Sequence, residues 1–288
     1  MNQSMNNFSL NTESCLIMSI INATNDSFSG DGIYSNSKFD LSKELDSMVS
    51  NGVDIVDVGG ESTRPKKVYK DVVEISENEE LDRVIPLIEK IKRNSDIFIS
   101  IDSKKPIVLD EAIKAGAVMA NDISMLEDED VLDVINRHQI HYVLGHFRQN
   151  LPHQNIISEV LSDLSKKIDI ITNSGFDRNK IIIDPGIGFG KKFGESKDIF
   201  ANIEILKKSF NLPIMIGTSR KSFIGEYTQK DIENRIFGTA STIAFAVLNG
   251  ANILRVHDYK EMIDVKKMTQ VLKDSRFKLW KIQKFFYP

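Results

Sequence analysis

The chain has 288 residues, of which 41% are hydrophobic and 27% are charged, a composition typical of a folded globular protein. Its net charge of −4 comes from 37 basic and 41 acidic residues, a balance that excludes a protein coating nucleic acid, which needs a basic excess. No stretch approaches the ~20 apolar residues of a membrane span, so we expect no membrane partner.

The N-terminal part of the sequence indicates the compartment. Residues 1–14 are rich in Asn and Ser and lack the basic start and apolar run of a secretory signal. This segment is either a flexible N-terminal extension or packs beneath the rest of the domain, and the sequence leaves both open. The single cysteine, Cys15, has no partner for an intramolecular disulfide, which favours a reducing environment. We therefore expect a cytoplasmic protein.

From residue 16 onward, short apolar or β-branched runs alternate with longer segments that have helical spacing. Each run is bounded by polar residues, Gly or Pro, and is short enough to be a buried strand. The runs lie at 16–21, 53–58, 97–101, 117–121, 141–144, 180–183, 213–216 and 252–256. Strands that alternate with helices pair in parallel through right-handed crossovers. Eight such strands predict an α/β protein with a single (β/α)8 TIM barrel covering 1–288.

A doubly wound sheet is the alternative fold, but the glycine-rich turn that usually follows its first strand is missing. Helical spacing is clear at 79–91, where Pro86 predicts a kink or a late helix start, and at 157–171. The closing segment 271–286 alternates basic and apolar residues, which favours an amphipathic helix over a membrane anchor. The longest irregular stretch, 59–76, has the length of a functional loop.

Polar or charged residues follow all eight predicted strands, at the end where the chemistry of a barrel enzyme is built. Asp102, Asn121 and Asp184 offer acceptors, which suit a planar heterocycle with several N–H groups, such as a pterin or guanine. The alternative role for Asp102 and Asp184 is helix N-capping. Lys221 could donate to the ring carbonyl or lie over the ring face, the alternative being an exposed surface lysine.

A second set of strand-end residues is cationic. Arg255 and His257 are two residues apart, so on an extended strand their side chains point the same way. Together with Thr63 and Arg64, which follow the second strand, they would clamp a phosphate or pyrophosphate. The alternative for Arg255 is an ion pair with the nearby Asp258.

Asn22, at the end of the first strand, offers a neutral oxygen that would help to hold Mg²⁺, an ion that relies largely on water and substrate phosphates. Its alternative role is that of a turn residue. The run 184–191 places three glycines at alternate positions, which lets a backbone approach a ring closely. Phe189 in this run would supply an apolar wall or pack in the core.

Several separated blocks occur in a fixed order between residue 17 and the mid-260s. They are 22–29 (NATNDSFS), 57–65 (DVGGESTRP), 101–103 (IDS), 121–124 (NDIS), 184–191 (DPGIGFGK), 219–222 (SRKS), 238–240 (GTA) and 255–258 (RVHD). In this order and spacing, the blocks resemble the dihydropteroate synthases, a family of folate-pathway enzymes. The resemblance implies a (β/α)8 barrel that joins 6-hydroxymethyl-7,8-dihydropterin pyrophosphate to 4-aminobenzoate and releases pyrophosphate and 7,8-dihydropteroate.

The resemblance also implies a role for each candidate residue. The pterin would be held by Asp102, Asn121, Asp184 and Lys221, and Mg²⁺ by Asn22. The pyrophosphate would be bound by Arg64, Arg255 and His257, and the 4-aminobenzoate bordered by Phe189, Lys221 and Ser222. Thr63 and Arg64 would sit on a loop that covers the site, and the catalytic set would be Thr63, Arg64, Lys221, Arg255 and His257. Mg²⁺ as cofactor, a homodimer and competition by sulfonamides are further implications.

The sequence departs from the family pattern mainly in the segment after the first strand. Asn25 stands where the family usually has Pro, and residues 30–32 read Gly-Asp-Gly instead of Asp-Gly-Gly. A methyltetrahydrofolate methyltransferase-like enzyme is one alternative, but it needs no pyrophosphate clamp. A non-catalytic pterin-binding protein is another, and the presence of Asn22, Thr63 and Arg64 argues against it.

Overall fold

The computed structural model describes residues 10, 15–23, 40–61, 74–147 and 155–286, with side chains up to residue 275. Eight strands form its centre, each within a few residues of a predicted run. They are β1 (Leu16–Asn22), β2 (Ile55–Gly59), β3 (Phe98–Asp102), β4 (Met119–Asp122), β5 (His141–Gly145), β6 (Ile181–Asp184), β7 (Met215–Ile216) and β8 (Ile253–Val256).

The eight strands form a closed parallel barrel. They pair in the order β6-β5-β4-β3-β2-β1-β8-β7. A parallel bridge between Ile183 and Ile214 joins β6 to the residues before β7, where the Ile183 amide donates to the Pro213 carbonyl over 2.9 Å. Closure places the carboxyl ends of all eight strands around one opening. The predicted (β/α)8 barrel is confirmed.

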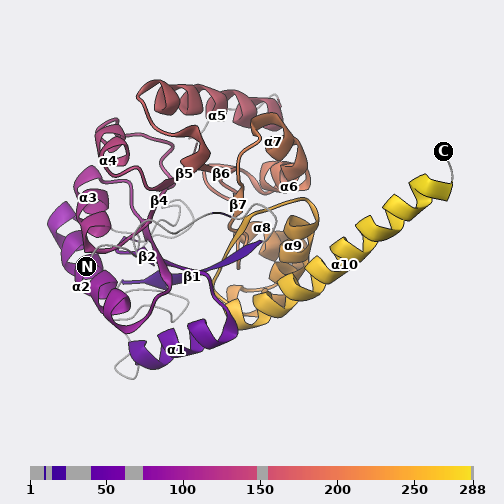
Figure 1. Ribbon diagram of the computed structural model, residues 1–288, viewed down its shortest axis with the longest axis horizontal. Coiled ribbons are helices and arrows are strands. Elements are labelled where there is room, and N and C mark those ends of the chain that lie inside the picture. The colour runs from indigo at the N-terminus through magenta and orange to yellow at the C-terminus, as the bar shows by residue number, and fades with distance from the viewer. Residues whose placement is uncertain (1–9, 11–14, 24–39, 62–73, 148–154, 287–288) are drawn as a thin grey trace.

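Helices surround the barrel as an outer ring (Figure 1). They are α1 (Leu41–Asn51), α2 (Glu77–Asn94), α3 (Pro106–Ala115), α4 (Val131–His138), α5 (Ile156–Asn173), α6 (Phe193–Ala201), α7 (Ile203–Phe210), α8 (Ser222–Thr228), α9 (Ile236–Leu248) and α10 (Tyr259–Phe286), with short 3₁₀ turns at Arg178–Lys180 and Ile232–Asn234. In Figure 1, α10 runs past the ring and away from the barrel.

Capping side chains set the start of the predicted helices. The Ser76 hydroxyl accepts the Glu79 amide over 3.2 Å at the start of α2, and three acidic residues fill the first turn. Pro86 lies inside this helix, so the prediction of a late start was wrong. The Asn155 side chain accepts the Ser158 amide over 3.1 Å and starts α5 at Ile156. These caps place both helices one or two residues earlier than their apolar spacing alone.

The last helix is longer than predicted. The segment expected at 271–286 is the second half of α10, which begins at Tyr259 directly after β8. Its first turn is fixed by the Met262 amide, which donates to the Asp258 carbonyl over 3.1 Å. Within the described part of the chain, none of the helices combines the length and the apolarity needed to cross a membrane.

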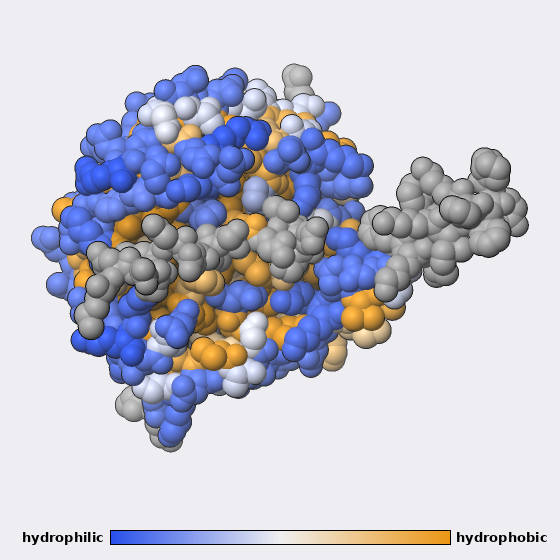
Figure 2. All heavy atoms as spheres, in the orientation of Figure 1, coloured by the Kyte–Doolittle hydropathy of each residue, from blue (hydrophilic) through white to orange (hydrophobic). Residues whose placement is uncertain are grey.

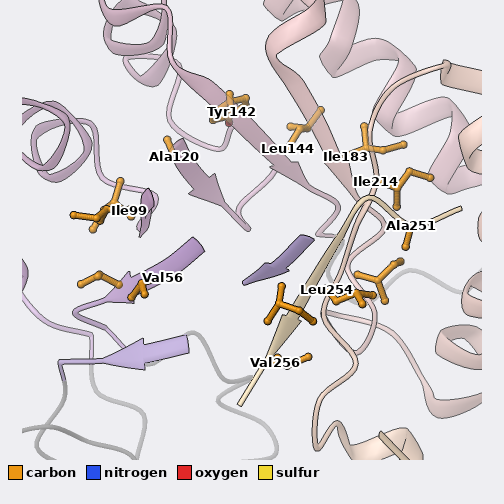
Figure 3. Packing of buried hydrophobic residues seen from close by; sticks show 14 of the residues in the cluster. Val56, Ile99, Ala120, Tyr142, Leu144, Ile183, Ile214, Ala251, Leu254 and Val256 are labelled. Carbon is orange, nitrogen blue, oxygen red and sulfur yellow. The ribbon is translucent and has the colours of Figure 1, made fainter. Parts of the chain in front are cut away.

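The hydrophobic core has two parts, because successive residues of a strand point to opposite sides. The outer part lies between the barrel and the helices and includes Val56, Ile99, Tyr142 and Leu254 (Figure 3). The inner part fills the barrel near the amino ends of the strands. Its buried members are Met18, Ile55, Met119, Val143, Ile182, Met215 and Ile253.

The inner core contacts the N-terminal segment at Leu10. Leu10 is half-buried and packs against this inner cluster. At Leu10 the chain therefore contacts the base of the barrel, in line with the second of the two alternatives from the sequence. Residues 1–9 and 11–14 lie outside the described residues.

Candidate active site

The side chains with candidate functions lie at the carboxyl ends of the strands. One register row crosses four neighbouring strands, pairing Asn22 with Gly59, Gly59 with Asp102, and Asp102 with Asn121. Residues paired across strands point to the same face of a sheet. The structure therefore brings together three residues that the sequence analysis assigned to metal and heterocycle binding.

A polar layer lies directly above the apolar inner core. Four inner-core residues are each followed, two positions later in the chain, by a polar or charged residue. The pairs are Ile55 and Asp57, Met119 and Asn121, Ile182 and Asp184, and Ile253 and Arg255. The even-numbered strands supply all four, which is how side chains are layered inside barrels of this type. The strand spacing thus places three oxygen-bearing side chains around one guanidinium.

Arg255 is the centre of this layer. Its Nε donates to Asp57 Oδ2 over 2.6 Å and its Nη2 to Asp102 Oδ2 over 2.6 Å. The Asn121 side-chain amide also donates to Asp57 Oδ2, over 3.0 Å. Asp57 is fully buried and Asp102 is 3% exposed, so these contacts are shielded from water. Asp57 orients both Arg255 and Asn121.

Two alternatives from the sequence are wrong for Arg255 and the aspartates. Asp258 pairs with Arg220, whose Nε lies 3.0 Å from Asp258 Oδ2, so it is not the partner of Arg255. Neither Asp102 nor Asp184 caps a helix, because α3 and α6 begin after lysines at 105 and 192. Asp184 Oδ1 instead accepts the Gly186 amide over 2.8 Å and shapes the loop after β6.

Burial changes the titration of the two strand-end aspartates. Burial raises the pKa of Asp102 from 3.8 to about 7, although the nearby Arg255 charge acts in the opposite direction. Burial also raises the pKa of Asp184, opposed by its hydrogen bond from Gly186 and the charge of Lys221. Such shifts concentrate at functional sites.

Several buried oxygens in this layer have acceptor capacity left over. Asp57 Oδ1, Asp102 Oδ1, Asn121 Oδ1 and the Ser100 hydroxyl are buried and have no hydrogen-bond partner among the described residues. Buried polar atoms without a partner are rare, because each costs roughly 1–3 kcal/mol. Two of the residues are predicted acceptors for a heterocycle, so a ligand with N–H groups would satisfy them.

Lys221 and Phe189 meet at one side of the site. The Lys221 ammonium lies 3.7 Å from the centre of the Phe189 ring, and Phe189 is 9% exposed. Lys221 is half-buried, so the alternative of an exposed surface lysine is wrong. Burial lowers the pKa of Lys221 to about 8, while Asp184 partly restores it. Ser222 follows Lys221 as the first residue of α8. The three residues predicted to border the 4-aminobenzoate are therefore neighbours.

His257 lies beside the carboxyl end of β7. Its backbone amide donates to the Ser219 hydroxyl over 3.2 Å, and its Nδ1 lies 3.1 Å from the same oxygen. The Ser219 hydroxyl therefore fixes the ring next to the strand that carries Arg255. Arg255 on β8 and His257, which directly follows β8, thus both lie at this opening.

Asn22 offers one oxygen to a magnesium site, whereas the nearest carboxylate oxygen, Asp102 Oδ2, already accepts from Arg255. A Cβ placed on Gly59 would lie 3.6 Å from Asn22 Oδ1 and 3.8 Å from Asp102 Oδ2, so the glycine leaves both oxygens beside one gap. Oxygen donors of this kind suit Mg²⁺, which keeps waters and takes phosphate oxygens from a substrate. Among the described residues, no cluster of three His, Cys, Asp or Glu could bind a metal by itself.

Two of the predicted site residues lie outside the described part of the chain, and two residues at the site had no predicted role. Thr63 and Arg64 lie outside the described residues. Sequence reasoning gave no role to Asp57, although its place at a strand end marked it. It also gave none to Lys191, whose only signal was its position at the end of the glycine motif.

Comparison with known proteins identifies the family. The model of the pterin-binding enzymes matches residues 18–257. A dihydropteroate synthase of Clostridium beijerinckii is 40% identical over 262 residues, covering 90% of this chain and 95% of the relative. A dihydropteroate synthase of Bacillus subtilis is 38% identical over 264 residues, covering 90% of this chain and 89% of the relative.

Solved structures agree with these relatives. The Yersinia pestis dihydropteroate synthase in complex with a sulfonamide drug superposes with a TM-score of 0.86 at 30% identity, covering 93% of this chain and 98% of that one. The Xanthomonas albilineans enzyme in complex with 7,8-dihydropteroate gives a TM-score of 0.79 at 30% identity, covering 92% of this chain and 95% of that one. The chain therefore belongs to the dihydropteroate synthase family of pterin-binding enzymes.

Proposed function

We propose that the polar layer around Arg255 is the active site in which this chain makes 7,8-dihydropteroate. As a family member the chain is a transferase of folate biosynthesis. It joins 4-aminobenzoate to 6-hydroxymethyl-7,8-dihydropterin pyrophosphate. The observation that carries the site assignment is the set of buried oxygens with acceptor capacity left over, on Asp102 and Asn121. The names of the relatives favour the synthase over a methyltransferase or a non-catalytic binding protein.

The pterin ring is held by acceptors below and a cation beside it. Asp102, Asn121 and Asp184 accept its N–H groups, and Lys221 donates to its carbonyl. Burial makes these hydrogen bonds stronger than they would be in water. Arg255 fixes Asp102 through its Nη2, so this acceptor is oriented before the substrate arrives.

The reaction replaces a C–O bond by a C–N bond at the exocyclic CH2 group of the pterin. The pyrophosphate oxygen takes the electron pair of the breaking bond, the amine nitrogen attacks the carbon, and the amine then loses a proton. Arg255 and His257 stabilise the charge that grows on the leaving oxygen, and Thr63 and Arg64, which lie outside the described residues, would add to this stabilisation. Asn22 would help to hold Mg²⁺, which supplies further charge neutralisation when bound.

The 4-aminobenzoate binds beside the pterin, between Phe189, Lys221 and Ser222. Phe189 gives an apolar surface to the benzene ring, and the Lys221 ammonium, 3.7 Å from the centre of the Phe189 ring, would lie between the two substrates. Since the arylamine is neutral at pH 7, no strong base is needed. A sulfonamide of similar shape competes for this subsite.

Two copies of the chain form a homodimer through α9 and α10. Phe237 and Leu248 on α9 are 85% and 46% exposed, and Met268, Val271 and Leu272 on α10 are 57–58% exposed. Figure 2 shows apolar side chains gathered next to the part of α10 that leaves the barrel. Large apolar side chains exposed on neighbouring helices are typical of an interaction surface. The dimer is cytoplasmic and has no nucleic-acid or membrane partner.

The first experiment measures pyrophosphate release by the purified chain with dihydropterin pyrophosphate and Mg²⁺, with and without 4-aminobenzoate. We expect release that depends on 4-aminobenzoate, with dihydropteroate formed in equal amount. Tight pterin binding without release would instead support a binding protein.

Asp184 tests the site assignment. Asp184→Ala removes an acceptor and the hydrogen bond that shapes the loop at Gly186, so we expect pterin binding to be lost. Isothermal titration with the pterin substrate measures this, and unfolding of the variant by urea checks that it remains folded. Unchanged turnover by a folded variant would show that the pterin binds elsewhere.

A further inference from the structure

Lys191 is a half-buried cation to which the site described above gives no role. It ends the loop between β6 and α6, and its ammonium donates to three backbone carbonyls: those of His146 (3.0 Å), Gly186 (2.9 Å) and Phe189 (3.0 Å). An ammonium has three N–H groups, so the protein backbone uses all of them. Lys191 therefore binds the chain itself and has no N–H left for a substrate.

The three carbonyls belong to a tight turn and to the end of a neighbouring strand. The turn is closed by the Phe189 amide, which donates to the Gly186 carbonyl over 3.0 Å, and Gly186 has a φ of +66°. Gly186 is so close to β5 that a Cβ there would lie 1.9 Å from the His146 carbonyl oxygen. Without a cation between them, these converging carbonyl dipoles would repel one another. Lys191 thus fastens the turn to the end of β5.

The turn carries one wall of the aryl-amine subsite. Phe189 is fixed at its carbonyl by Lys191, and its ring supports the Lys221 ammonium at 3.7 Å. The Gly188 backbone packs against Lys221, because a Cβ placed on Gly188 would lie 3.4 Å from Lys221 Cδ. Contacts therefore run without a break from the Lys191 ammonium to the Lys221 ammonium.

The pterin acceptors on β3 and β4 are fixed by other contacts. Asp102 is held by Arg255, and Asn121 is held by Asp57. Loosening of the 186–190 turn would therefore disturb Phe189 and Lys221 first. It would also affect Asp184, which accepts the Gly186 amide, and would affect Asp102 and Asn121 least.

We propose that Lys191 is a positioning residue for the 4-aminobenzoate subsite, where it holds the Gly186–Phe189 turn so that Phe189 and Lys221 face the second substrate. The proposal rests on the proposed function for the identity of that substrate. Lys191 touches neither substrate and acts through the backbone of Phe189.

Lys191→Met tests the proposal, because methionine keeps most of the side-chain length and removes the three donors. Lys192→Met is the matched control, since Lys192 is the next residue and its side chain is exposed. We expect the KM for 4-aminobenzoate to rise about tenfold in Lys191→Met, as for other small misplacements of a substrate-contacting group. The Kd of the pterin substrate should rise by a smaller factor than this KM, because Asp184 and Lys221 contact the turn but Asp102 and Asn121 are held by other residues. The control should match the parent in both.

A second readout needs no turnover. Hydrogen exchange of the 186–190 amides, measured by mass spectrometry on the ligand-free chain, should be faster in Lys191→Met and unchanged in Lys192→Met. Unchanged exchange together with an unchanged KM would overturn the proposal. So would equal weakening of pterin and 4-aminobenzoate binding, because that is the signature of a general loss of structure. Failure of the parent chain to make dihydropteroate would contradict the proposed function, while the exchange measurement still tests Lys191.

Discussion

At the scale of single residues, Arg255 organises the site because it lies between two buried carboxylates. Its fork contacts Asp57 and Asp102 with two different nitrogens, each at 2.6 Å. Removing ionised groups from water is costly unless each is paired, so one guanidinium shared by two carboxylates leaves an excess of negative charge. Burial raises the pKa of Asp102 to about 7, the Arg255 charge opposes this shift, and the nearby Asp57 charge adds to it.

The titration of Asp102 makes the stability of the chain depend on pH. In the unfolded chain this carboxyl has its ordinary pKa of 3.8, so between about pH 4 and 7 the folded chain binds more protons than the unfolded one. The contribution of Asp102 to the free energy of unfolding therefore decreases as the pH rises through this window, by up to about 1.4 kcal/mol per pH unit. Asp102→Asn removes the effect.

Urea unfolding of the parent and of Asp102→Asn at several pH values from 4.5 to 7.5 measures this difference. We expect the parent to lose stability relative to the variant as the pH rises. Parallel pH dependences for the two proteins would show that Asp102 titrates outside this window.

At the scale of secondary-structure elements, the strand ends and the helix starts hold the site in place. Lys105 precedes α3, only three residues after Asp102, and its ammonium donates to Glu61 (2.7 Å), Glu80 (2.6 Å) and the Ile75 carbonyl (2.8 Å). One lysine thus links the end of β2, the approach to α2 and the first turn of α2. Burial acts to lower the pKa of Lys105, but hydrogen bonds to Glu61 and Glu80 outweigh it and raise the pKa.

Loss of this lysine should destabilise the barrel. Lys105→Met leaves the buried Glu80 carboxylate and the half-buried Glu61 carboxylate without their cation, and breaking a buried ion pair such as Lys105–Glu80 costs about 3–5 kcal/mol. Lys104→Met is the control, because Lys104 is half-exposed and contacts only the exposed Glu127 among the described residues, over 3.4 Å. Denaturant unfolding compares the two variants. If they prove equally stable, the Lys105 contacts contribute nothing to the fold.

At the scale of the whole molecule, the ring of helices is complete around the barrel, but α9 and α10 keep an apolar face exposed. These two helices pack against one another, and α10 continues past the ring (Figure 1). A stable interface needs roughly 800 Å² from each partner, which a pair of helices can supply. This face is therefore where we place the second copy of the chain.

A charge on the exposed face tests the dimer. Leu272→Asp should shift the protein from twice the chain mass to the chain mass in size-exclusion chromatography with light scattering, because a carboxylate would be buried unpaired in the interface. Ile107→Asp is the control, since Ile107 is 46% exposed on α3, at a distance from this face in the ring. A parent chain that elutes as a monomer would overturn the dimer, and a dimeric Leu272→Asp would move the interface elsewhere.

The sequence by itself determined the architecture and named most residues of the candidate site. Eight apolar runs separated by helical segments leave few folds other than a closed parallel barrel, because each run must be buried on both sides. Once the barrel is inferred, Asn22, Asp102, Asn121, Asp184, Arg255 and His257 follow as neighbours, since parallel strands end at one opening. Helix starts were predicted less well where a cap such as Ser76 outweighed the breaker Pro86.

Only the tertiary structure decided which of these residues contact one another. Asp57 and Arg255 are 198 positions apart in the chain, and their contact depends on barrel closure and strand register, which no local pattern encodes. For the same reason the sequence suggested Asp258 as a partner of Arg255, since Asp258 is near in the chain but pairs with Arg220. The role of Lys191 was equally hidden, because its three acceptors are backbone carbonyls, which every residue carries, and only the folded chain brings them together.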